Sequence, residues 1–198
     1  MSKNNRYIDW KNWDKDSFAK TSKLEEAYFN NIVKLLKLKK SSKILEIGTY
    51  TGYSAICLAR GLKKDGVLHT IDINEELEYF AREYFEKANL SKQIISHVGN
   101  AMDILPKLNI SWDLVFIDAD KENYINYFNL VIDKLNNNGV ILADNVLWSG
   151  KVINSEDHDL TTNVLREFNK SVNNDNRVET ILLPIRDGIS IIRINPSI

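Results

Sequence analysis

This sequence has a single cysteine, no long apolar run and no excess of one sign of charge, and each of these features excludes some classes of protein. The 198 residues contain one cysteine, Cys57, so the chain forms no framework of disulfides and fits a reducing cytoplasm. No apolar run approaches the ~20 residues of a transmembrane helix. The polar start, residues 1–6, lacks the apolar core of a signal peptide. We therefore expect a cytoplasmic protein.

Neither sign of charge dominates. Lys and Arg together number 26, Asp and Glu number 27, and the formal net charge is -1. The chain therefore has no global basic field that would attract nucleic acid or an anionic membrane, although a local basic patch remains compatible with this balance. Hydrophobic residues make up 43% of the sequence, which at this length suits one domain with a full core.

The apolar residues alternate between strand-like runs and helical stripes. Five runs have strand length, at 44–47, 67–71, 93–98, 112–117 and 140–143. Helical spacing predicts helices at 24–36, 53–62, 74–88, 124–135 and 164–172, the fourth ended by Asn138-Gly139. Two last runs, 180–185 and 189–194, flank Arg186-Asp187-Gly188 and predict a β-hairpin. The repeated β-α order predicts an α/β fold with a parallel sheet covered on both faces.

Acidic residues follow three of the predicted strands. Glu46 ends the first strand, Asp118 follows the fourth, and Asp144 and Asn145 follow the fifth. Parallel strands bring their carboxyl ends to one edge, where open α/β sheets bind ligands. Two carboxylates and an amide oxygen suit Mg²⁺, Ca²⁺ or Mn²⁺. Zinc is not expected, because the three histidines are isolated in the sequence and form no cluster with cysteine.

A glycine-containing turn connects the first strand to its helix. Gly48 to Ser54 has the spacing G-x-x-x-G, which permits close approach of a ligand but is equally compatible with a structural turn. Asp72 ends the second strand, where a carboxylate can accept hydrogen bonds from ribose hydroxyls. The alternative makes Asp72 part of the helix start that Asn74 caps. With Glu46 nearby, the turn suits the cationic S-adenosylmethionine better than NAD.

Lys121 lies three residues after Asp118 near a helix start. Lysine becomes a usable base where a dry pocket and a neighbouring cation favour its neutral form. The alternative is a solvated lysine paired with Glu122 or Asp120, and spacing alone leaves both interpretations open.

Five segments together resemble a known family. They are Leu45–Ser54 (LEIGTYTGYS), Ile71-Asp72, Gly99-Asn100-Ala101, Phe116–Tyr124 (FIDADKENY) and Asp144–Gly150 (DNVLWSG). These motifs resemble the cation-dependent O-methyltransferases, the group of catechol and caffeoyl-CoA O-methyltransferases and their bacterial relatives. The resemblance covers about residues 23–194. It implies a Rossmann-like class I methyltransferase fold with a seven-stranded, mostly parallel sheet, a C-terminal antiparallel strand and helices on both faces. Residues 23–198 would form a single domain, preceded by an arm at 1–22.

The resemblance also implies roles for individual residues. Those implied for the S-adenosylmethionine site are Glu46, Gly48, Ser54, Asp72, Ala101 and Asp118, with Asp72 at the ribose and Ser54 at the methionine end. Those implied as metal ligands are Asp118, Asp144 and Asn145. Lys121 matches the catalytic base, and Trp148 and Asp187 lie where relatives contact substrate.

The implied reaction is methyl transfer from S-adenosylmethionine to one hydroxyl of a vicinal aromatic diol of the catechol, caffeoyl or flavonoid type. It would depend on a divalent cation, Mg²⁺ in the first place. One alternative is methylation of a tRNA hydroxyuridine, which the near-neutral charge disfavours unless Lys37, Lys39, Lys40 and Lys43 form a patch. Another alternative is a non-catalytic S-adenosylmethionine-binding or scaffold protein. The presence of the full set Asp118, Lys121, Asp144 and Asn145 disfavours it. Relatives are commonly dimers, so a homodimer is expected.

Two departures from the family pattern concern the choice of substrate. The segment before residue 23 does not match the N-terminal arm of the plant enzymes. Arg186 stands where many relatives have a glycine before Asp-Gly.

Overall fold

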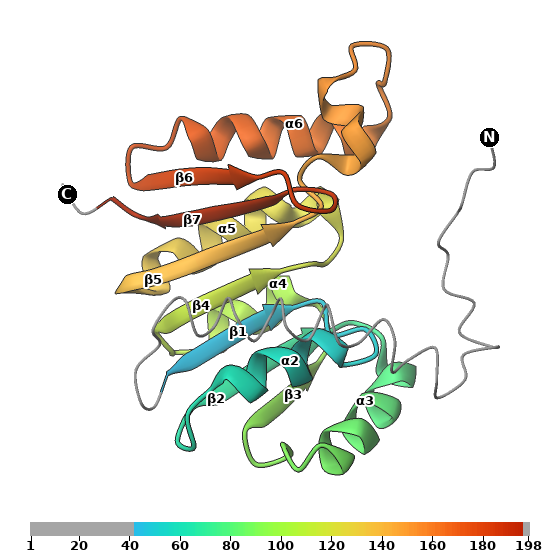
Figure 1. Ribbon diagram of the computed structural model, residues 1–198, viewed down its shortest axis with the longest axis vertical. Helices are drawn as coiled ribbons and strands as arrows, with labels where there is room; N and C mark the ends of the chain where they lie inside the picture. Colours follow the sequence, from blue (N-terminus) through green and yellow to red (C-terminus); the bar gives the residue numbers. More distant parts are fainter. Residues whose placement is uncertain (1–41, 196–198) are drawn as a thin grey trace.

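Seven strands form one sheet in the computed structural model, which describes residues 42–195 (Figure 1). The strands are β1 (Lys43–Ile47), β2 (Val67–Asp72), β3 (Ile94–Val98), β4 (Trp112–Ile117), β5 (Leu135–Asp144), β6 (Val178–Leu183) and β7 (Ile189–Ile194). The predicted helix at 24–36 and the arm at 1–22 lie outside the described residues.

The strand order is β3-β2-β1-β4-β5-β7-β6. Neighbours from β3 to β5 are parallel, whereas β7 is antiparallel to both β5 and β6. The seven-stranded sheet with an antiparallel C-terminal strand is therefore confirmed. Strands β2 and β3 lie on one side of β1, and β4 and β5 lie on the other. The strand order therefore reverses between β1 and β4, and sheets of this kind bind ligands at such a switch point.

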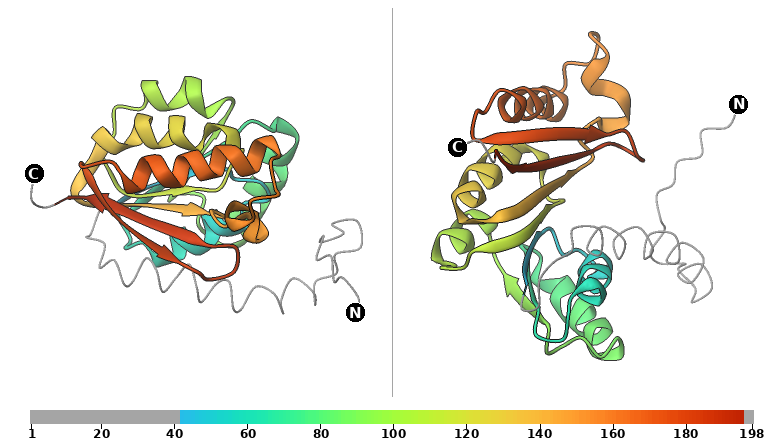
Figure 2. Two further views of the ribbon diagram at one scale, coloured as in Figure 1. Left: turned by 90° about the horizontal axis from the view of Figure 1, so that it is seen from above. Right: turned by 60° about the vertical axis from the view of Figure 1, so that its left-hand side comes forward.

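Helices cover both faces of the sheet (Figure 2). They are α2 (Tyr53–Gly61), α3 (Glu75–Lys87), α4 (Ala101–Ile104), α5 (Tyr124–Val131) and α6 (Leu160–Asn173), with 3-10 turns η2 (Leu105–Lys107), η3 (Lys121–Asn123), η4 (Ile132–Lys134) and η5 (Trp148–Ile153). Successive strand residues point to opposite faces. Accordingly, Leu45 and Ile47 pack under α4, α5 and α6, and Ile44 packs under α2 and α3. None of the helices in residues 42–195 has the length and apolarity needed to cross a membrane.

The predicted helix over 124–135 is wrong at its C-terminal end. Helix α5 ends at Val131, and β5 already begins at Leu135, which pairs with Trp112 of β4. Val140 then pairs with Leu114, so residues 136–139 bulge opposite the single residue Asp113. Leu135 continues the helical spacing of α5 while being buried as a strand residue, which is why periodicity misplaced the boundary. The short helix α4, capped by Asn100, was not predicted.

The sequence suggested three isolated histidines, but two of them contact each other in the structure. His69 of β2 and His97 of β3 lie on neighbouring strands, with His69 Nδ1 2.9 Å from His97 Nε2 and their rings stacked. Burial, reinforced by the charges of His97 and Lys43, lowers the pKa of His69 to about 4. The pair therefore stays neutral at pH 7 as part of the sheet.

Candidate active site

The acidic strand ends meet at one edge of the sheet. Strand β1 pairs in parallel with β4, and β4 with β5, so the three segments end side by side. The backbone N–H of Asp118 donates to the carbonyl of Ile47 over 2.9 Å and joins the ends of β4 and β1. The predicted convergence of Glu46, Asp118 and Asp144 on one edge is confirmed.

Gly48 is required by the close approach of these two strand ends. Its φ is +104°, and a Cβ there would lie 2.0 Å from the carbonyl oxygen of Asp118. The next residues of the turn are tied to β2, because the N–H of Tyr50 donates to Asp72 Oδ2 over 2.7 Å. Asp72 Oδ1 accepts from the N–H of Asn74 over 2.9 Å. Asp72 is therefore a helix-start residue that also holds the turn, and its contact with a ribose stays a prediction.

Glu46 lies fully buried directly before the turn. Its Oε2 accepts from the Thr70 hydroxyl over 2.5 Å, whereas Oε1 has no hydrogen-bond partner among the described residues. Burial raises the pKa of Glu46 to about 8, although the Ser54 and Thr70 hydroxyls oppose the rise. A buried carboxyl oxygen without a partner is costly unless a ligand supplies one. An ammonium group, such as that of S-adenosylmethionine, fits this requirement.

A cleft of about 390 Å³ opens beside the turn. Four residues predicted for the cofactor line it, namely Gly48, Asp72, Ala101 and Asp118. The same cleft is lined by residues that the sequence analysis did not assign to it, among them Asn100, Asp120, Asn123 and Tyr127. Glu46 and Ser54 do not line the cleft, and Glu46 lies beneath the turn.

Asp120 was considered only as a partner for Lys121, and the structure gives it another role. Its Oδ1 accepts from the Tyr127 hydroxyl over 2.6 Å, and its Oδ2 accepts from Asn123 Nδ2 over 2.5 Å. Burial and the Asp120 contact raise the pKa of Tyr127, which remains a hydrogen-bond donor. The sequence signal for this part of the cleft is the Asp-x-Asp spacing directly after β4, since Asp118 and Asp120 both line the cleft.

Lys121 is not a solvated lysine. Its side chain is 9% exposed, and Nζ lies 3.1 Å from Asp118 Oδ1 and 3.0 Å from Asn145 Oδ1. The ammonium also donates to the Tyr124 hydroxyl over 2.5 Å, and that hydroxyl donates to the carbonyl of Asp144 over 3.0 Å. Tyr124 was not predicted as a site residue, because its place in the apolar stripe of α5 identified it only as core. It holds the Lys121 amine against the ends of β4 and β5.

Two of the three predicted metal ligands, Asp118 and Asn145, contact this amine, and the third, Asp144, directly precedes Asn145. Asp144 is buried, and burial together with the charge of Asp118 raises its pKa to about 6, while the Asn145 N–H, Lys121 and Arg186 oppose the rise. Across residues 42–195 no group of three or more His, Cys, Asp and Glu side chains is placed to hold a metal, and this set has two carboxylates and one amide. The Lys121 nitrogen already lies between an Asp118 and an Asn145 oxygen, so the oxygens accept a positive charge. The donor set therefore fits a hard divalent cation.

The sequence matches the model of the O-methyltransferase family over residues 13–195. The chain belongs to this O-methyltransferase family. It is 38% identical over 185 residues to caffeoyl-CoA O-methyltransferase 2 of Eucalyptus globulus, covering 87% of this chain and 74% of the relative. It is 36% identical to caffeoyl-CoA O-methyltransferase 1 of Arabidopsis thaliana, covering 87% and 71%.

Solved O-methyltransferases have the same fold. The Bacillus cereus O-methyltransferase, solved in complex with SAH, is 30% identical with a TM-score of 0.79, covering 87% of this chain and 81% of that one. TomG of Streptomyces achromogenes, solved in complex with SAM, is 28% identical with a TM-score of 0.77, covering 87% and 80%. The protein is an S-adenosylmethionine-dependent O-methyltransferase.

The segment after β5 follows directly on Asp144 and Asn145. Asp187, which the sequence analysis predicts to contact substrate, holds this segment. Its carbonyl accepts from the N–H of Leu147 over 2.9 Å, and its carboxylate accepts from the N–H of Ser149. Trp148 is partly buried and packs against the core under α5 and α6. Both residues lie beside Asp144, and their contact with substrate stays a prediction.

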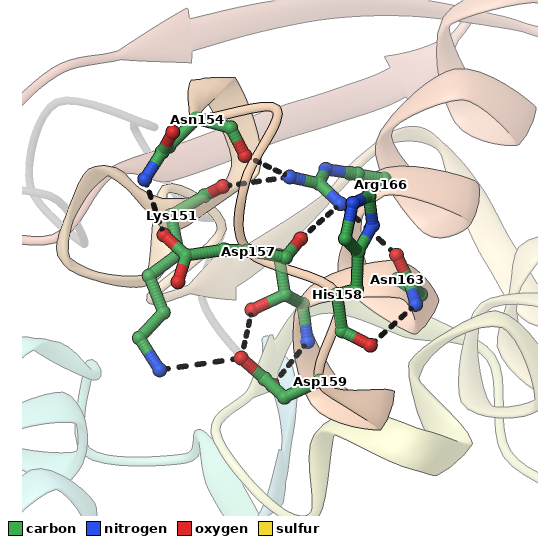
Figure 3. A network of polar contacts seen from close by, with 8 residues as sticks. Lys151, Asn154, Asp157, His158, Asp159, Asn163 and Arg166 are labelled. Atoms are coloured by element: carbon green, nitrogen blue, oxygen red, sulfur yellow. Dashed lines mark hydrogen bonds and ion pairs between the residues drawn. The ribbon is translucent and has the colours of Figure 1, made fainter.

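Arg166 of α6 organises the loop that continues from Trp148 (Figure 3). The guanidinium donates to four backbone carbonyls, those of Lys151 (2.9 Å), Val152 (3.0 Å), Asn154 (2.5 Å) and Asp157 (2.6 Å). It also donates to Asn163 Oδ1 over 3.0 Å. Arginine alone among side chains has enough fixed N–H donors for such a set. The loop over 151–157 is therefore wrapped around one side chain.

We predict that Arg166→Lys loosens this loop, because one ammonium cannot reach four carbonyls. The free energy of unfolding should fall by about 1–3 kcal/mol, and limited proteolysis should cut within 151–157 faster than in the wild type. The control is Arg193→Lys, at an exposed arginine that pairs with Glu179. Equal cleavage rates for wild type and Arg166→Lys would contradict the prediction.

Proposed function

We propose that this O-methyltransferase methylates one hydroxyl of an aromatic molecule that carries two adjacent hydroxyls, with a divalent cation, Mg²⁺ in the first place. The observation that supports the proposal most is the convergence of Asp118, Asn145 and the buried Lys121 amine within about 3 Å at the edge of the cleft. The caffeoyl-CoA O-methyltransferases to which the chain is similar are named for an acceptor of this chemical type.

The cofactor side and the acceptor side share Asp118. On the cofactor side, Asp72 would accept hydrogen bonds from the ribose hydroxyls, and Glu46 would receive the methionine ammonium, with Ser54 nearby. On the acceptor side, Asp118, Asp144 and Asn145 would hold the cation. When bound, S-adenosylmethionine supplies the electrophilic methyl group, and the cation supplies positive charge next to the acceptor oxygens.

Lys121 is the base in this scheme. In its neutral form the amine accepts the proton of the hydroxyl that is methylated, and Tyr124 keeps the amine in position. S-adenosylmethionine would supply the methyl group to this acceptor oxygen, and the electron pair of the broken carbon–sulfur bond would stay on sulfur. The proton leaves on Lys121 and passes to solvent. Positioning accounts for much of the rate enhancement, because both reactants lie beside the same strand ends.

Methyl transfer to catechol and to phenol, with S-adenosylmethionine and Mg²⁺, tests the proposal. We expect a monomethyl ether from catechol and turnover of phenol slower by at least about a hundredfold, because phenol lacks the second oxygen for a bidentate contact. Equal rates with both acceptors, or no turnover of any vicinal diol, would refute the proposal.

The tRNA alternative gains no support from the comparisons. Most of the lysines that would form its basic patch lie outside the described residues, and the cleft is lined by carboxylates. The homodimer, the single domain over 23–198 with its arm, and the cytoplasmic location stay predictions.

A further inference from the structure

Two threonine hydroxyls form a chain that ends at the buried Glu46 carboxyl. Glu46 of β1 and Thr70 of β2 are partners in the parallel register of the sheet, so both side chains lie on the same face. The Thr70 hydroxyl donates to Glu46 Oε2 over 2.5 Å, and Thr70 Oγ1 lies 2.5 Å from Thr49 Oγ1. Because Thr70 has a single hydroxyl proton, Thr49 is the donor to Thr70, and both hydroxyls donate toward the carboxyl.

The chain of hydroxyls is buried and held by the backbone around it. Glu46 and Thr70 are both 0% exposed, and Thr49 is 7% exposed. The turn that carries Thr49 is joined to β2, because the N–H of Gly48 donates to the carbonyl of Ile71 over 2.9 Å. Neither Thr49 nor Thr70 lines the cleft beside the turn. Their hydroxyls therefore act on a bound cofactor through Glu46.

The charges around Glu46 do not favour its ionised form. Burial is the main cause of the raised pKa of Glu46, and the negative charges of Asp118 and Asp72 add to the rise. The hydroxyls of Ser54 and Thr70 lower the pKa, because hydrogen bonds to a carboxylate stabilise its charge. Within the part of the chain that the structure describes, hydroxyl donors therefore stabilise the ionised carboxyl against two neighbouring carboxylates.

We propose that Thr70, supported by Thr49, is a positioning residue for cofactor binding. It holds Glu46 Oε2 and leaves Oε1, which has no hydrogen-bond partner among the described residues, to the methionine ammonium of S-adenosylmethionine. A carboxylate whose other oxygen is already bonded needs no rearrangement when the ammonium arrives, so more of the charge-assisted contact contributes to affinity. The inference rests on the proposed function, which assigns the ammonium to Glu46.

S-adenosylhomocysteine and 5′-methylthioadenosine provide the test, because they share the nucleoside and the thioether but only the first carries the ammonium. Their affinities are measured by calorimetry, which needs no turnover. In Thr70→Val, which keeps the shape of the side chain and removes the hydroxyl, the affinity for S-adenosylhomocysteine should fall about tenfold. The affinity for 5′-methylthioadenosine should stay at the wild-type value. Thr70→Ser, which restores the hydroxyl, should recover the binding of S-adenosylhomocysteine.

The matched control is Thr180→Val on the edge strand β6, where the threonine hydroxyl is also buried but has no hydrogen-bond partner among the described residues. It should leave both affinities at the wild-type value. Thr49→Val removes only the donor to Thr70 and should weaken S-adenosylhomocysteine by a smaller factor, about threefold. This variant provides the test if Thr70→Val does not fold.

Glu46→Gln separates the role of Thr70 from the assignment of the ammonium. If Glu46→Gln weakens S-adenosylhomocysteine alone while Thr70→Val binds it as the wild type does, the role of Thr70 is refuted and the proposed function stands. Equal weakening of both ligands by Thr70→Val would also refute it, because the hydroxyl would then only support the fold. If Glu46→Gln leaves both affinities unchanged, the assignment of the ammonium to Glu46 fails and this inference with it.

Discussion

Replacing Lys121 with methionine is expected to lower kcat for catechol methylation by about 10²–10⁴-fold, the usual contribution of a positioned base. Methionine keeps the length and apolar stem of the side chain but removes the amine that contacts Asp118, Tyr124 and Asn145. Turnover should be measured at saturating S-adenosylmethionine and acceptor, so that the change reports on the chemical step.

Cofactor binding distinguishes loss of the base from loss of the fold. Lys121 does not line the cleft, so Lys121→Met should bind S-adenosylmethionine with about the wild-type affinity in calorimetry. The control is Lys87→Met, at an exposed lysine that pairs with Glu83 on α3. A Lys121→Met enzyme with kcat within about threefold of wild type would rule out the base assignment.

Chelation of divalent cations is expected to lower catechol methylation by about 10³-fold, because the cation contributes several kcal/mol of charge stabilisation. Added Mg²⁺ should restore the rate. Full activity in excess EDTA would remove the metal from the proposal.

The variant Asp144→Asn tests whether the loss of activity on chelation arises at the proposed metal site. The substitution keeps an oxygen that can accept from the N–H of Asn145, which Asp144 Oδ1 does over 2.7 Å, but it removes the negative charge. The Mg²⁺ concentration needed for half-maximal rate should therefore rise at least about tenfold, and titration with Mn²⁺ followed by electron paramagnetic resonance should show the same weakening without turnover. The control is Asp113→Asn, at the amino-terminal end of β4 and away from the carboxyl ends of the strands, where the Asp113 carboxylate accepts from Asn136 Nδ2.

Much of the fold follows from local signals in the sequence. Apolar runs of strand length identified β1, β2 and β4, and Asn74 with the acidic first turn identified the start of α3, where its side chain accepts from the N–H of Glu76. These signals involve residues only a few positions apart, so they can be identified from the sequence without knowledge of tertiary contacts. The misplaced boundary at Leu135 arose where one apolar residue satisfied both a helical stripe and a buried strand.

The site residues likewise fall into two groups, those that the sequence identified and those that it did not. Residues at strand ends, such as Asp118 and Asp144, were identifiable because parallel pairing brings strand ends together wherever the strands lie in the chain. Tyr124, Tyr127 and Arg166 were not identified as site residues. Their roles depend on hydrogen bonds to partners on other segments, which no periodicity encodes.

The residues alone therefore determined the strand–helix order, the three acidic strand ends and the family of this enzyme, since each is carried by short motifs whose spacing is visible in one dimension. Tertiary packing alone decided that the Lys121 side chain is largely shielded between two strand ends, that Glu46 Oε1 has no hydrogen-bond partner within residues 42–195, and that Ile189 of β7 lies beside Asp144. Burial and charge proximity are properties of surfaces brought together from distant parts of the chain. They arise only when β1, β4, β5 and β7 lie side by side.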